Sequence, residues 1–102
     1  MRQFDLFDNP SSRQRESAPF VVVLSSHFLG GLAEVIVAPV VRRELLKPNA
    51  VDIPVRFDGE VFVVSVIGMA ALRRTDLKRR RGSIVDFEFE IRRALDRLFT
   101  GF

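Results

Sequence analysis

The chain has 102 residues and a formal net charge of +3, and 47% of its residues are hydrophobic. This length is typical of one domain, and this composition supplies enough apolar side chains for a core, so we expect a single domain over residues 1–102. Without cysteine and with only one histidine, His27, the chain excludes disulfide frameworks, thiol catalysis and cysteine-based zinc sites. We expect no cofactor and no metal.

The first residues, Met1 to Asp8, are charged every few positions and lack the apolar stretch of a secretory signal. The longest uncharged stretch, residues 17–33, contains Gly30 and Gly31 and is shorter than the ~20 apolar residues that cross a membrane. We therefore expect a soluble cytoplasmic protein that does not contact a membrane.

Positive charge is concentrated in one segment. Residues 73–81 hold six basic residues and one acidic residue, a local charge of +5, which leaves −2 for the rest of the chain. This pattern indicates a basic loop on a nearly neutral body rather than a nucleic-acid-binding face. Two interpretations stay open: a solvated loop, or a docking site for an acidic partner segment, because arginine pairs well with carboxylates.

In the first half of the chain we predict short strands separated by turns. Strands are expected at residues 3–7, 20–24 and 35–38, an exposed loop at 8–17, a turn at Gly30-Gly31 and a short helical turn at 40–46. The apolar, β-branched run at 20–24 is typical of a strand that is buried on both faces or lies at a dimer interface. The strand at 35–38 is expected to end at Pro39.

The clearest local signal is a hairpin. Apolar and polar residues alternate over residues 51–57, and Asp58-Gly59 then predicts a two-residue type I′ turn into a partner strand at 60–67. Because Pro54 cannot donate a ladder hydrogen bond, its strand is expected at a sheet edge or to carry a bulge there.

The final segment changes to a helical period. Its apolar positions are Ile84, Phe87, Ile91, Leu95 and Leu98. We expect a helix with a capping box at Ser83 and Asp86, an ion pair between Glu88 and Arg92, and a left-handed cap at Gly101. Antiparallel strands followed by one helix indicate a small, strongly curved sheet or barrel with the helix packed on it.

Catalysis finds little support. Asp86, Glu88 and Glu90 are two residues apart and do not share a helix face. The serines that precede His27 are adjacent in sequence to it, and no acid is placed to orient the ring. We therefore expect a binding protein rather than an enzyme, with a homodimer as the commonest way to cover apolar strands.

Five segments carry a family resemblance in a shared order and spacing: Gln3-Phe4, Phe20–Val23 with Ser26–Leu29, Val35–Pro39, Ile53–Val55 with Asp58–Glu60, and Ala94–Phe102. In these the chain resembles the CcdB family, the toxins of plasmid and chromosomal toxin–antitoxin modules. The resemblance implies a mainly β fold, an SH3-like barrel of the CcdB/Kid type, with antiparallel strands and one C-terminal α-helix, in a homodimer.

The resemblance also implies a mechanism. Such toxins bind the A subunit of DNA gyrase and trap the complex in which DNA is cleaved, so they meet DNA only indirectly, through gyrase or the antitoxin. A cognate antitoxin neutralises them through a flexible acidic tail, and the complex represses its own operon.

Carried over residue by residue, gyrase binding falls on Thr100, Gly101, Phe102, Asp96, Ser26, Phe28 and Leu29. The family closes on Trp-Gly-Ile where this chain has Thr100-Gly101-Phe102, so a large stacking surface is lost at Thr100. The family's helix Asn is Asp96 here, which adds a negative charge. For an acidic antitoxin segment, guanidinium groups are offered by Arg13, Arg15, Arg42, Arg43, Arg79 and Arg80.

Two alternatives stay open. MazF- and Kid-like toxins share the barrel and cleave mRNA, which needs a general base and positioned cations. A decayed toxin would instead keep only antitoxin binding and operon co-repression.

Overall fold

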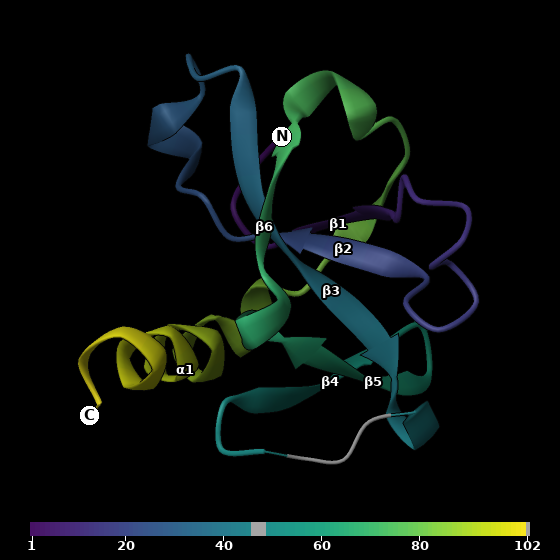
Figure 1. Cartoon of the computed structure of the whole chain (residues 1–102), viewed down its shortest axis with the longest axis vertical. Helices are drawn as coiled ribbons and strands as arrows, with labels where there is room; N and C mark the ends of the chain where they lie inside the picture. The colour runs from purple at the N-terminus through teal and green to yellow at the C-terminus, as the bar shows by residue number, and fades with distance from the viewer. Residues whose placement is uncertain (46–48, 102) are drawn as a thin grey trace.

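The computed structural model describes residues 1–45 and 49–101 of the chain. Its elements are β1 (Asp5–Asp8), β2 (Phe20–Val23), β3 (Glu34–Arg42), β4 (Asp52–Phe57), β5 (Glu60–Ser65), β6 (Ala70–Arg73), β7 (Arg80–Ser83) and α1 (Glu88–Thr100), with short 3-10 turns between them. The strands form one antiparallel sheet in the order β4-β5-β3-β2-β1-β7, and β6 pairs with β3. The sheet curls into a half-barrel with α1 at its open side (Figure 1). This confirms the predicted mainly β fold with one C-terminal helix and is consistent with an SH3-like barrel.

Strand β2 is buried on both faces, as its apolar run predicted. Val22 and Leu24 belong to the larger core, which also holds Leu6, Val64 and Ile91. The alternate residues, Val21 and Val23, pack in a second cluster on the other face of the sheet, with Phe7, Val35, Val37 and Leu77. The chain therefore covers both faces of β2 by itself.

Strand β3 does not end at Pro39, contrary to the prediction, but continues to Arg42. Its first half pairs with β6 through Val37, and its last three residues pair with β5 from Val40 onward. The Ile36 carbonyl faces β2, where it accepts from Leu24, so by alternation the backbone of Pro39 faces the opposite side. Pro39 thus occupies the point where β3 changes partners, and no ladder bond needs its missing N–H.

The predicted helical turn at 40–46 is wrong in its first half. Residues 40–42 extend β3, and a 3-10 turn, η2, covers Arg43–Leu45. Leu46, the last residue of that prediction, lies outside the described residues.

The hairpin forms as predicted. Asp58 and Gly59 both have positive φ, 53° and 79°, and Phe57 pairs with Glu60 across the two-residue turn. Strand β4 is an edge of the sheet. From the Phe57–Glu60 pair the register turns the backbone of Pro54 away from β5, so its missing N–H falls on the free edge.

The basic segment 73–81 is not the free loop that its composition suggested. Arg73 closes β6, the turn η4 (Arg74–Asp76) follows, and Arg80 and Arg81 open β7, which pairs with β1. Leu77 is buried between them. Strands β6 and β7 pair with β3 and β1, which are distant in sequence, so the local sequence does not predict them.

Helix α1 begins at Glu88, after the turn η5 (Val85–Phe87), and buries Ile91 and Ala94. The predicted capping box is wrong: the Ser83 hydroxyl accepts from the Val85 N–H, and the N-cap Phe87 has no side-chain cap bond. Gly101 adopts the predicted left-handed cap, with φ 80° and its N–H donating to the Arg97 carbonyl at 3.0 Å. The Glu88–Arg92 pair also forms, at 2.8 Å. No helix within the described ranges is long and apolar enough to cross a membrane.

Candidate functional site

A short exposed turn presents the first group of predicted gyrase-binding residues. Ser26 caps the 3-10 turn η1 (His27–Leu29), because its hydroxyl accepts from the Phe28 N–H at 3.2 Å. The Phe28 side chain is 87% exposed, and Leu29 is exposed beside it. An exposed aromatic ring on a capped turn offers most of its surface to a pocket of another protein.

This turn faces the start of α1. A cleft of about 340 Å³ is lined by Ser26 and Phe28 on one side and by Val85, Glu88 and Arg92 on the other. Arg92 is held in place there, since its guanidinium donates to Glu88 at 2.8 Å and to the Gln3 side chain at 3.2 Å. The cleft therefore combines exposed apolar side chains with a positioned cation.

The second group lies at the other end of α1. Asp96 and Thr100 are exposed on neighbouring turns, and the Thr100 hydroxyl donates to the Asp96 carbonyl at 2.6 Å. Gly101 follows as the helix cap, while Phe102 lies outside the described residues. Phe99 is not among the predicted gyrase-binding residues, but it is 71% exposed beside them. Because Phe99 lies outside the apolar stripe of the predicted helix, the sequence could have indicated that it is exposed.

The two groups do not meet within one chain. Glu88, beside the η1 turn, and Thr100 are twelve residues apart on a continuous helix. At 1.5 Å per residue this separation is about 18 Å.

The predicted antitoxin-binding arginines gather partly around the loop that follows β1. Arg15 and Arg79 line one cleft of about 560 Å³ together with Asp8, Pro10, Asp76 and Lys78. The loop is fixed by buried Asn9, whose amide donates to the Ala18 carbonyl at 2.9 Å and whose backbone oxygen accepts from Arg15 at 2.6 Å. Arg15 is thereby oriented beside Arg79.

The other arginines differ in availability. Arg42 holds the far side of the same loop, donating to the Glu16 carbonyl at 2.9 Å, and lies 3.8 Å from Glu60. Arg13, on the loop, and Arg43, on η2, are exposed. Arg80 instead pairs with the buried carboxylate of Asp5 at 3.2 Å, so it is engaged within the fold.

The serines near His27 have structural partners. The Ser25 hydroxyl accepts from the Ile36 N–H at 2.6 Å, and Ser26 caps η1. The His27 ring lies 4.6 Å from the Phe28 ring and 3.5 Å from the Arg2 guanidinium. In residues 1–45 and 49–101 no group of three acidic, histidine or cysteine side chains is placed to hold a metal ion.

Comparison with known proteins gives one result that covers nearly the whole chain. The family model described as CcdB protein matches residues 3–101. A comparison with curated proteins gives no match. The chain therefore belongs to the CcdB family and is a toxin of the type found in toxin–antitoxin modules.

Proposed function

We propose that the protein is a single-domain toxin that binds the A subunit of DNA gyrase and traps the complex in which DNA is cleaved, with no chemistry of its own. Family membership over residues 3–101 supports this target class. The observation that carries the proposal is the exposed Phe28 ring on its capped turn, next to the cleft with Arg92. A large exposed aromatic beside a fixed cation is typical of the anchor of a protein interface.

The working unit in this proposal is a homodimer. The η1 group and the Thr100 group lie about 18 Å apart along α1, so a compact gyrase site needs one group from each of two copies. Exposed apolar side chains on and near the β3–β6 pair, Ile36 and Ile67, support an interface between copies.

Neutralisation is proposed to come from a cognate antitoxin with a flexible acidic segment. Arg13, Arg15, Arg42, Arg43 and Arg79 surround or adjoin the loop after β1, and such a segment would order along them on binding. We place the action in the cytoplasm, where gyrase meets DNA, and assign operon repression to the toxin–antitoxin complex. DNA contact is indirect in both cases.

A plasmid cleavage assay tests the gyrase proposal. Purified protein is added to supercoiled plasmid, gyrase from the same host and ATP, followed by detergent and protease. Linear DNA that rises with protein dose and requires gyrase supports the proposal, and removal of Thr100-Gly101-Phe102 should abolish it. Phe28→Ala should lower the yield at least tenfold, whereas Leu45→Ala, an equally surface-directed change on η2, should not.

Absence of linear DNA would overturn the gyrase assignment. Tight antitoxin binding under the same conditions would then favour a decayed toxin. Cleavage of labelled mRNA by the purified protein would instead favour the ribonuclease alternative.

A further inference from the structure

Helix α1 carries a large apolar side chain that its packing on the sheet does not use. The Phe89 ring is 67% exposed on the first turn of the helix, whereas Ile91 and Ala94 are buried. Because successive residues of a helix turn by about 100°, Phe89 points to the side opposite the buried stripe. The sheet therefore leaves this ring to solvent.

Phe89 lies in line with two residues of the second predicted gyrase-binding group. Asp96 and Thr100 follow it by seven and eleven positions, close to two and three full turns, so the three side chains share the outward face of α1. All three residues are exposed. The helical rise places Phe89 about 10.5 Å from Asp96 along the axis. The ring is thus on the side of α1 that a partner can approach.

The same ring borders the η1 group. Glu88 precedes Phe89, and Arg92 lies three positions beyond it on the next turn; both line the cleft of about 340 Å³ that Phe28 also lines. Val85, on the same wall of this cleft, is 50% exposed. Three exposed apolar side chains therefore surround two charged ones. Scattered exposed apolar residues are ordinary, but a cluster with a charged rim is typical of an interface.

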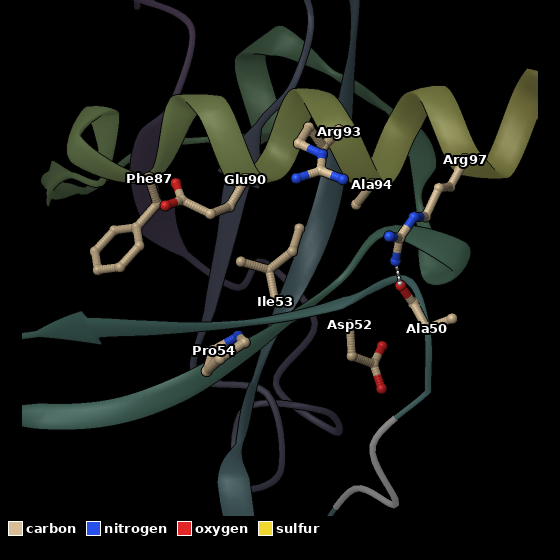
Figure 2. Close-up of a pocket in the computed structure, with 9 residues that line it drawn as sticks. All are labelled: Ala50, Asp52, Ile53, Pro54, Phe87, Glu90, Arg93, Ala94 and Arg97. Carbon is tan, nitrogen blue, oxygen red and sulfur yellow. Dashed lines mark hydrogen bonds between the residues drawn. The ribbon is translucent and has the colours of Figure 1, made fainter. Parts of the chain in front are cut away.

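Arg93 contacts the ring from the other side of this helix face. Its guanidinium carbon lies 5.8 Å from the centre of the Phe89 ring, within the range of a cation–π contact. Arg93 itself lines a further cleft, of about 410 Å³, between α1 and β4 (Figure 2). Phe89 therefore stands on the ridge of α1 between this cleft and the one that Phe28 lines.

We propose that Phe89 is a further contact residue for the gyrase A subunit, and that with Phe28 it supplies the aromatic surface that Thr100 does not offer. This inference rests on the proposed function and names a residue outside the positions carried over from the family. Continuity identifies the occupant, because a partner seated on Phe28 and Arg92 meets Phe89 at the edge of the same surface.

Binding and poisoning are measured side by side. Calorimetry with the gyrase A subunit gives the affinity, and the plasmid cleavage assay gives the protein concentration for half-maximal linear DNA. Phe89→Ala should weaken binding about tenfold or more and raise that concentration by the same factor, since it removes an aromatic anchor. The variant should melt within about 4 °C of the parent, because an exposed ring contributes little to the core.

A crosslinking variant separates direct contact from an indirect effect on the fold. The photoreactive residue p-benzoylphenylalanine, placed at Phe89, should crosslink to gyrase A on irradiation, and the same residue placed at Leu45 should not. Leu45 is the matched control because it is 55% exposed on η2, outside every surface proposed for gyrase. Leu45→Ala should change binding less than about twofold.

Two results would overturn this inference while the gyrase proposal stands: parent-level binding by Phe89→Ala, or a folded crosslinking variant that gives no product with gyrase A. A parent protein that neither binds gyrase A nor yields linear DNA would overturn both. The behaviour of the parent thus tells the two failures apart.

Discussion

Phe57 at the end of β4 lies against Gly82 of β7, and this contact joins the two ends of the strand order. A β-carbon built on Gly82 would lie 2.6 Å from Cε1 of the Phe57 ring. The Phe20 ring packs edge-on against the same ring, with the two centroids 5.5 Å apart. A glycine is required here because the ring occupies the space of a side chain.

Gly82→Ala should therefore destabilise the fold. Displacing a packed ring typically costs about 1–3 kcal/mol. Each kcal/mol corresponds to a Tm decrease of about 4–8 °C for a domain of this size. Gly31→Ala is the control, since a β-carbon there meets nothing within 4 Å. A melting curve for Gly82→Ala that coincides with the control would show that Phe57 moves aside freely.

Asp5→Asn should also lower stability. The buried Asp5 carboxylate accepts from the Arg2 backbone N–H at 2.9 Å and from the Arg80 guanidinium at 3.2 Å. The Asn side chain is neutral and has only one accepting oxygen, so it cannot keep both contacts. We expect a loss of about 1–3 kcal/mol in urea unfolding. Asp8→Asn breaks only the longer contacts to Arg79 and Arg81, at 3.8 and 3.5 Å, and should cost less than about 1 kcal/mol. Equal losses would contradict a special role for the buried pair.

Thr100→Trp should strengthen gyrase poisoning. The Thr100 hydroxyl bonds back to the Asp96 carbonyl, so the side chain offers little surface to a partner. An indole would add a large stacking face at the helix end. We expect half-maximal linear DNA at a protein concentration at least tenfold lower. Thr100→Val removes the same hydrogen bond without adding an aromatic ring and should give no gain; a gain in both variants would assign the effect to the lost bond.

Arg15→Ala and Arg79→Ala should weaken antitoxin binding, and salt should reduce the difference between variant and parent. Both side chains line one cleft, where each can reach the same acidic segment. We expect each substitution to weaken binding about two- to fivefold in low salt by calorimetry, from about 0.4–1 kcal/mol per exposed pair. The control is Arg56→Ala, which removes one positive charge from an exposed position on β4. Equal weakening by Arg56→Ala would indicate attraction to net charge alone.

The elements that the sequence predicts well are those with local causes. The Asp58-Gly59 turn needs two positive φ angles, and the helix stripe from Ile91 to Leu98 repeats at a fixed period, so neither depends on distant residues. Strands β6 and β7 form because β3 and β1 offer them edges. Short strands of Ala, Arg and Gly have no periodic signal, so only the assembled sheet shows them.

The candidate sites follow the same division. Exposure of Phe28 and capping by Ser26 come from the local turn, and the resemblance had already pointed to both residues. The engagement of Arg80 with Asp5 joins positions 75 residues apart, and no spacing in the sequence announces it. The cleft of about 410 Å³ between α1 and β4 could not be predicted either, because its walls come from the hairpin and the helix, which are far apart in the sequence.

Pro54 has a consequence for how the protein behaves in concentrated solution. A sheet edge recruits further chains when its outward N–H and C=O groups form a continuous template. On β4 the outward positions are Asp52, whose N–H already donates to Asn49, then Pro54, which has none, and Arg56, which carries a charge. The template is interrupted at its centre, so this edge resists stacking into fibres even when many copies accumulate.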